Sequence, residues 1–174
     1  MNKIIVIGGG PAGMLAAVSA SGDDTKVILL EKNDKLGKKL FITGKGRCNI
    51  TNSADTSVIM KNIMTNPKFM YSALESYDNS DIIRDIESFG CKVKEERGGR
   101  MFPVSDHSSD VIKALSNMLD NAGVEVRLRS EVKKIEKTEQ GFDVFFSNGK
   151  KENADAVIVA TGGKIGRASC RERV

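Results

Sequence analysis

The chain has 174 residues, of which 40% are hydrophobic, 29% charged and 5% aromatic, with a formal net charge of +4. This composition is typical of one globular α/β domain and excludes disordered, collagen-like and disulfide-stapled chains. No apolar run approaches the roughly 20 residues of a membrane helix, and the first one ends at three glycines, so we expect neither a membrane partner nor a signal peptide, and a cytoplasmic protein.

The sequence begins with a strand, a helix and a second strand. Residues 3–7 and 26–30 are continuous apolar runs, which are typical of buried parallel strands. The stretch between them, 11–21, is rich in Ala and Gly and predicts a short helix that packs closely. Together they predict a right-handed βαβ unit. The glycine- and lysine-containing segment 34–52 that follows is predicted to be mostly structured loop.

Helical periodicity dominates the middle of the chain. Three amphipathic helices are predicted: one that begins at Asn66–Pro67 with an apolar face from Phe69 to Tyr77, one over 80–89 and one over 109–122. The segment 98–106 is predicted to be extended or looped.

Strand patterns return after residue 123. Four strands are predicted, over 124–128, 131–137, 142–147 and 155–160, with the middle two forming a hairpin. The fold class is therefore α/β. It is the ββα three-layer, Rossmann-like version of an FAD/NAD(P)-binding domain, with a parallel sheet, helices on one face and a small antiparallel hairpin on the other.

A glycine motif, Gly8-x-Gly10-x-x-Gly13, lies between the first strand and the first helix. The first glycine permits a sharp turn, the second allows the backbone to approach a pyrophosphate, and the third lets helix and strand pack closely. The pyrophosphate would then accept hydrogen bonds from free N–H groups at the helix start. Glu31 ends the second strand, where an acid binds ribose hydroxyls and disfavours a 2′-phosphate. The pattern predicts dinucleotide binding; a tight turn without a ligand is the alternative.

Several further motifs appear in order and carry a family resemblance: GGGPAG at 8–13, EK at 31–32, GKKLFITGKGRCNITN at 37–52, RMFPVSD at 100–106 and ATGG at 160–163. Together they resemble the bacterial NAD(P)/FAD-dependent oxidoreductases, a group of aminoacetone-oxidase-like and bile-acid dehydroxylation reductase-like flavoproteins. The resemblance covers residues 1 to about 164. It implies FAD as the cofactor and NAD(P)H as a possible co-substrate.

The resemblance also implies a role for individual residues. The pyrophosphate would be held by the glycine turn and by the turn after the last strand, and the ribose by Glu31. Two lysines would flank the adenosine, the GRCN segment would extend towards the flavin, and one strand residue would meet the adenine through its backbone. The predicted cofactor-binding residues are Gly8, Gly10, Pro11, Ala12, Gly13, Glu31, Lys32, Lys39, Gly46, Arg47, Cys48, Asn49, Val132, Ala160, Thr161 and Gly162.

Some of these residues also fit simpler structural roles. Lys32 and Lys39 also suit a solvated basic surface. Cys48 has no partner cysteine nearby and is more often a buried apolar side chain than a catalytic thiol. Arg47 is interpreted as functional, because its planar fork suits phosphate or a flavin carbonyl. No catalytic acid or base is identified, and three cysteines without a C-x-x-C pair favour neither a disulfide framework nor a metal site.

The last ten residues have a different character from the rest. Residues 165–174, IGRASCRERV, show no helical or strand period and resemble a translated sequencing adapter; a native basic tail is the alternative. We therefore expect residues 1–164 to be the amino-terminal part of an FAD-binding domain that is incomplete at its carboxyl end. On its own such a part would be poorly soluble, bind FAD weakly and be inactive.

The functional hypothesis is a flavin-dependent oxidoreductase that transfers hydride to or from a small-molecule substrate. Two alternatives remain: a non-catalytic nucleotide-binding module and a flavoprotein that acts on RNA. The small positive charge, two Tyr and no Trp give little support to a nucleic-acid partner.

Overall fold

The computed structural model describes residues 1–163, so the tail predicted at 165–174 lies outside the described part of the chain. These residues form two compact units. The first contains residues 1–36 and the described residues from 122 onward, and the second contains residues 37–121.

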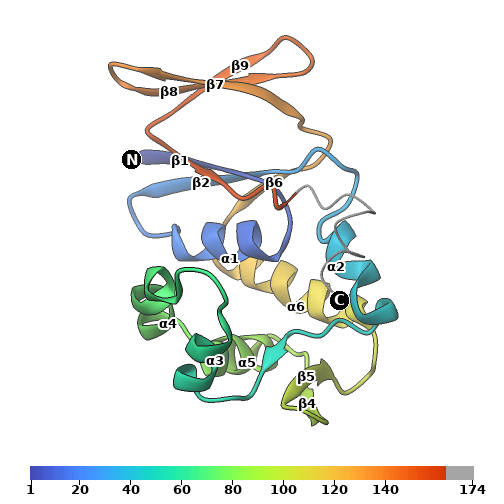
Figure 1. Ribbon diagram of the computed structural model, residues 1–174. Coiled ribbons are helices and arrows are strands. Elements are labelled where there is room, and N and C mark those ends of the chain that lie inside the picture. Colours follow the sequence, from blue (N-terminus) through green and yellow to red (C-terminus); the bar gives the residue numbers. More distant parts are fainter. Residues whose placement is uncertain (164–174) are drawn as a thin grey trace. The chain divides into compact units, whose positions relative to one another are not determined.

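The first unit is built on a four-stranded parallel sheet (Figure 1). Its strands are β1 (Asn2–Ile7), β2 (Thr25–Leu30), β6 (Glu125–Arg127) and β10 (Ala156–Val159), in the order β10-β1-β2-β6. The register pairs Ile7 with both Leu30 and Val159, so the carboxyl ends of three strands meet at one edge. The predicted strand–helix–strand unit is confirmed.

Helix α1 (Pro11–Ser19) covers one face of this sheet (Figure 1). Pro11 occupies the first helical turn, where its missing N–H has no carbonyl to bond and its fixed φ suits the helix. The buried side chains of Met14 and Ala17 are small or flexible enough for the helix to lie close to the strands.

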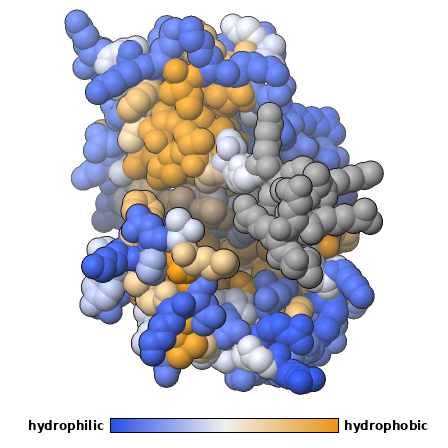
Figure 2. All heavy atoms as spheres, viewed as in Figure 1, coloured by the Kyte–Doolittle hydropathy of each residue, from blue (hydrophilic) through white to orange (hydrophobic). Residues whose placement is uncertain are grey.

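An antiparallel sheet covers the opposite face. It contains β7 (Val132–Thr138), β8 (Gly141–Phe146) and β9 (Lys151–Ala154), so the predicted hairpin has a third strand. Strand β9 has a polar sequence with no apolar alternation, because only Ala154 in that strand is buried, so the sequence pattern did not predict it. The core between the two sheets consists of Ile5, Ile7, Ile28, Leu30, Val144 and Ala154. In Figure 2 hydrophobic side chains gather over these two sheets.

The second unit is mainly helical. Its elements are α2 (Lys38–Ile42), a 3-10 turn (Thr43–Gly46), β3 (Thr51–Asn52), α3 (Thr56–Asn62), a second 3-10 turn (Pro67–Met70), α4 (Tyr71–Ser76), α5 (Asn79–Ser88), β4 (Val93–Glu96), β5 (Arg100–Pro103) and α6 (Ser108–Asn121). The strands form a small antiparallel sheet in the order β3-β5-β4. Helices α5 and α6 match two of the predicted helices, and β5 is the segment predicted to be extended or looped.

The predicted helix after Asn66 differs from expectation. It is split into a 3-10 turn and the short helix α4, and its apolar face is not buried, with Phe69 80% exposed. Asn66 itself has a left-handed backbone (φ 49°) rather than a capping conformation. The prediction of one continuous helix with a buried face is therefore wrong, because burial of an amphipathic face depends on packing partners that the sequence pattern does not specify.

Residues 1–163 lack two features, a membrane-spanning helix and a metal-binding cluster. No helix in this range combines the length and the apolar character that spanning a bilayer requires. The same range contains no group of three or more His, Cys, Asp or Glu side chains arranged to hold a metal ion.

Candidate functional site

The carboxyl edge of the parallel sheet brings together three segments that the sequence singles out. The glycine turn follows β1, Glu31 follows β2, and Ala160–Gly162 follow β10. Backbone hydrogen bonds fix the geometry: Gly8 N–H donates to Leu30 O at 2.8 Å and Ala160 N–H donates to Ile7 O at 2.8 Å. In open α/β sheets this edge is where ligands bind.

Two glycines are required by close packing at this edge. Gly8 has φ 115°, and a Cβ there would lie 2.4 Å from the carbonyl oxygen of Ala160. A Cβ on Gly13 would lie 1.8 Å from the carbonyl oxygen of Gly8. Both distances are far shorter than a carbon–oxygen contact allows, so the turn, the helix start and the end of β10 pack together only because both residues lack side chains.

Gly10 has the opposite environment. A Cβ built there would lie more than 4 Å from every atom of the described residues other than its chain neighbours, so within residues 1–163 the backbone is open to an approaching group. Met14 N–H donates to Gly10 O at 2.9 Å and starts the helical ladder. The N–H groups of Ala12 and Gly13 come before that bond in the first turn, so they have no carbonyl partner within the helix, and the helix dipole favours an anion there. The cradle therefore fits a pyrophosphate.

Glu31 is buried and holds the glycine turn against the end of β2. Its Oε2 accepts from Gly9 N–H at 2.7 Å, and its Oε1 accepts from Asn33 N–H at 2.8 Å and Asn33 Nδ2 at 2.6 Å. The sequence predicted ribose binding for this carboxylate but missed the contribution of Asn33. A short amide two residues after an acid can bond back to it, which is the signal that could have found this contact.

The remaining predicted residues of this unit vary in exposure. Lys32, Thr161 and Gly162 are exposed, and Ala160 is half-buried. Val132 begins β7, pairs with Phe146 and packs against the core between the sheets. Adenine contact through Val132 stays a prediction.

A groove of about 780 Å³ lies elsewhere on this unit and is lined by Lys3, the β7–β8 turn and β9. Four of its charged side chains form ion pairs with one another: Lys3 with Glu152 at 2.5 Å and Lys151 with Asp143 at 2.7 Å. It also lies away from the glycine turn. We therefore place the candidate site at the carboxyl edge of the strands and not in this groove.

The second unit carries the other predicted cofactor residues. Lys39 is exposed on α2, and the turn 43–49 contains Gly46, Arg47, Cys48 and Asn49. The Arg47 guanidinium bonds Asp106 at 2.6 and 2.9 Å and also contacts Glu96. Its Cζ lies 4.4 Å from the centroid of the Phe102 ring. These acidic and aromatic partners were not foreseen from the sequence.

Cys48 and Asn49 have local structural partners. The Cys48 side chain is completely buried. The Asn49 amide nitrogen, in the orientation that hydrogen bonding favours, lies 3.0 Å from Thr51 O and 3.2 Å from Met101 O. Contact of either residue with a cofactor remains a prediction.

Comparison with known proteins assigns the family. The model of the HI0933-like protein Rossmann domain matches residues 2–168. This chain belongs to that FAD-binding Rossmann family. The family assignment confirms the flavoprotein oxidoreductase resemblance and the Rossmann-like fold class predicted from the sequence.

Individual relatives of this HI0933-like domain have different names. The chain is 34% identical over 171 residues to the 3-dehydro-bile acid delta(4,6)-reductase of Clostridium scindens, covering 97% of this chain and 41% of the relative. It is 32% identical over 160 residues to the ribosomal RNA dihydrouridine synthase of Escherichia coli, covering 91% and 39%. The chain thus spans about two fifths of the length of these relatives. Among solved structures, Thermovibrio ammonificans THI4 has the same fold, with a TM-score of 0.60 and 12% identity over 99% of this chain and 62% of that chain.

The thiols of this HI0933-like domain are expected to be unreactive while it is folded. Burial raises the pKa of Cys48, and burial followed by the nearby Asp110 raises the pKa of Cys91 to about 11. Because the thiolate is the reactive form, iodoacetamide at pH 7.5 should modify both at least about tenfold more slowly than in urea. Peptide mass mapping gives the two rates separately; equal rates in buffer and urea would contradict the burial of these side chains.

The stability of the domain is expected to depend on pH through Asp106. Hydrogen bonds from Lys94 and then Arg47 hold the pKa of this carboxyl below its usual value. The unfolded state therefore binds more protons, and the stabilisation is present above the unfolded pKa of about 4 and is lost as pH falls through the native pKa. Thermal melts should be recorded from pH 7 to 2.5. At pH 7 the melting temperature of Asp106→Asn should be lower than that of the unmodified chain, and this difference should vanish at the acid end of the range. A difference that stays constant with pH would assign the effect to packing instead.

Proposed function

We propose that this chain binds FAD, with its first unit holding the ADP half, and that it forms the cofactor-binding part of a larger flavin-dependent oxidoreductase. The observation that carries the proposal is the Gly8–Gly13 turn. Close packing requires glycine at Gly8 and Gly13, while Gly10 leaves the backbone open beside first-turn N–H groups that have no partner within the helix. An anion-binding cradle at the carboxyl end of β1 is what a pyrophosphate requires.

Glu31 would select the ribose. Within residues 1–163 its Oε2 accepts one hydrogen bond, from Gly9 N–H, which leaves a lone pair for a ribose hydroxyl. The same negative charge would repel a 2′-phosphate. Bound FAD supplies hydride acceptance and donation at the flavin ring, whereas the protein supplies binding and orientation.

The binding test uses flavin fluorescence. Titrating the chain into FAD should quench the fluorescence saturably, and ADP should compete, whereas ADP carrying a 2′-phosphate should compete at least about tenfold less well. Because the chain corresponds to two fifths of its curated relatives, we expect a dissociation constant in the micromolar range, on the order of 10 μM. Absence of saturable binding of both FAD and ADP would overturn the proposal.

The names of the two relatives suggest a reaction class. One is a reductase of the delta(4,6) double bonds of a 3-oxo steroid, and the other makes dihydrouridine from uridine. Both names are consistent with reduction of a carbon–carbon double bond, and we take conjugation of that bond to a carbonyl group as part of the proposal. We extend this to the whole protein: it would reduce such a double bond in a small-molecule substrate by net addition of hydride and a proton, with NAD(P)H as the source of the reducing equivalents and FAD as the cofactor.

The full-length protein tests the reaction. Under anaerobic conditions NADH or NADPH should bleach the flavin absorbance, and a conjugated enone should restore it with formation of the saturated ketone. The matched control is the saturated ketone, which should restore nothing. A flavin that only molecular oxygen reoxidises would contradict a double-bond reductase, and a flavin that no nicotinamide reduces would favour the non-catalytic nucleotide-binding alternative.

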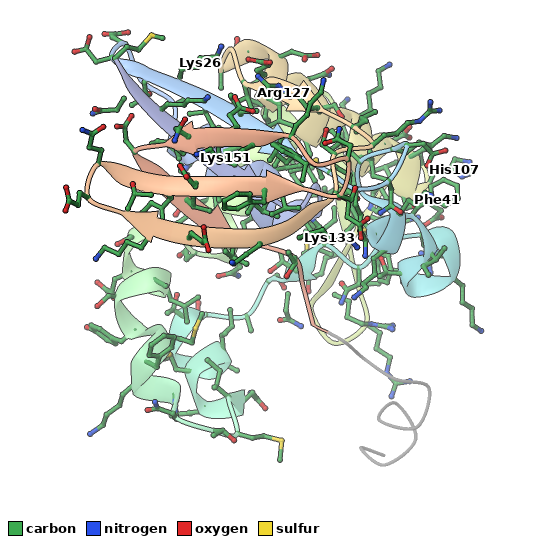
Figure 3. The ribbon with its side chains drawn as sticks, turned by 90° about the horizontal axis from the view of Figure 1, so that it is seen from above. Lys26, Phe41, His107, Arg127, Lys133 and Lys151 are labelled. Carbon is green, nitrogen blue, oxygen red and sulfur yellow. The ribbon has the colours of Figure 1, made fainter. Side chains whose placement is uncertain are left out.

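A flavoprotein that acts on RNA is the second candidate, supported by the 32% identity to the Escherichia coli synthase. The charge on the antiparallel sheet weighs against it. Lys133 pairs with Glu131 at 2.9 Å, and Lys151 with Asp143 (Figure 3). Basic side chains that are neutralised by neighbours offer little to a phosphate backbone. The same reoxidation assay with uridine-containing RNA in place of the enone separates the two candidates. Only an enzyme that acts on RNA should reoxidise its reduced flavin with it.

A further inference from the structure

The turn 43–49 in the second unit has an unfavourable backbone conformation. Gly44, Lys45, Gly46 and Cys48 have φ values of 56°, 58°, 86° and 62°. Lys45 and Cys48 carry a Cβ, so a left-handed conformation costs each of them about 1 kcal/mol or more. Such a conformation persists only where contacts outside the turn enforce it.

Arg47 supplies such contacts from the middle of the turn. Its Nε and Nη2 donate to Asp106 Oδ1 at 2.9 and 2.6 Å, and its Nη1 and Nη2 donate to the two carboxylate oxygens of Glu96. The guanidinium stacks on Phe102, which is buried. These partners belong to the β4–β5 hairpin and to the turn that follows it.

A second cation completes the cluster. Lys94 Nζ donates to Asp106 Oδ2 at 2.8 Å, so Asp106 bridges Lys94 and Arg47. Two cations and two carboxylates balance, and each side chain is about one third exposed. In this arrangement the guanidinium donors face carboxylates, and the two carboxylates would repel a phosphate brought to the same place.

We propose that Arg47, together with Asp106 and Glu96, is a positioning residue that holds the turn 43–49 in its left-handed conformation and does not itself bind a cofactor phosphate. The inference rests on the proposed FAD binding and on the family resemblance, which implies that the GRCN segment extends towards the flavin. It changes the role of Arg47 expected from the sequence. Loosening the Arg47 contacts then weakens binding of FAD but leaves binding of ADP unchanged.

Hydrogen exchange without any ligand tests the contact between cluster and turn. Arg47 N–H donates to Gly44 O and Cys48 N–H to Thr43 O, both at 3.2 Å, so both amides report on the turn. Asp106→Asn should accelerate exchange of these two amides about tenfold, while amides of α6 stay unchanged. The matched control is Glu95→Gln, which removes an exposed carboxylate from the same strand as Glu96. Equal exchange in Asp106→Asn and Glu95→Gln would overturn the proposal.

Ligand affinity separates positioning from direct contact. For a positioning role, Asp106→Asn and Arg47→Ala should each weaken FAD binding about tenfold, change ADP binding less than about twofold, and show no further loss when combined. Arg47→Lys, which keeps the charge, should recover part of the affinity. If Arg47 touches the cofactor, Asp106→Asn frees its guanidinium and should leave FAD binding unchanged or stronger, which would overturn the proposal.

Failure of the proposed function and failure of the proposed role of Arg47 give different results. If the unmodified chain binds neither FAD nor ADP, the proposed function is wrong, and the exchange measurement still decides the role of Arg47. If Asp106→Asn does not fold, as judged by circular dichroism, Glu96→Gln removes the other carboxylate and is read by the same criteria.

Discussion

Among alanine substitutions in the glycine turn, Gly13→Ala is expected to destabilise the first unit most. Its Cβ would lie 1.8 Å from the carbonyl oxygen of Gly8 and 3.3 Å from the Ala160 side chain. Relief requires α1 to move away from the ends of β1 and β10. We expect a loss of about 3 kcal/mol in the free energy of unfolding, and loss of ADP binding. Urea unfolding, monitored by circular dichroism, measures the free energy of unfolding, and calorimetric titration measures ADP binding.

Gly10→Ala is the matched control for that experiment. Apart from its chain neighbours, no atom in the described part of the chain lies within 4 Å of a Cβ built at Gly10, and the φ of −83° suits any residue. The free energy of unfolding should therefore change by less than about 1 kcal/mol, while the new methyl group occupies the approach to the helix start and ADP binding is lost. If Gly10→Ala binds ADP normally, the pyrophosphate does not lie over Gly10.

Glu31→Ala should produce the second large effect. It leaves Gly9 N–H, Asn33 N–H and Asn33 Nδ2 without their carboxylate acceptor. The Gly9 amide is buried, so its lost bond carries the main penalty, and Asn33 is partly able to bond water instead. We expect a loss of about 2 kcal/mol of stability, together with at least about tenfold weaker ADP binding, because the ribose also loses its partner.

Glu31→Gln provides the comparison. The amide keeps one oxygen acceptor and the side-chain shape, so most of the stability should remain. ADP carrying a 2′-phosphate should compete better against this variant than against the unmodified chain, because the repelling charge is gone. If both variants behave alike in stability and in ligand preference, Glu31 acts neither through its hydrogen bonds nor through its charge.

Local patterns predicted the βαβ unit, the glycine turn and the acid at the end of β2. Each depends on residues close in sequence: a continuous apolar run, glycines at fixed spacing and a single carboxylate. The short polar strand β9 and the one-turn pieces of the second unit were missed, since neither carries enough residues for a period to show. The helix after Asn66 was recognised as amphipathic, but the exposure of Phe69 could not be foreseen.

The sequence by itself determined the family, the strand–turn–helix frame and the positions where a side chain is not tolerated. Tertiary structure decided which groups meet. Arg47 donates hydrogen bonds to Glu96 and Asp106, which lie 49 and 59 residues further along the chain. Gly9 N–H donates to Glu31, which lies 22 residues further along. Backbone propensity and periodicity act over a few residues, whereas the partner of a charged or buried polar group depends on which strand ends and turns the fold brings to one place.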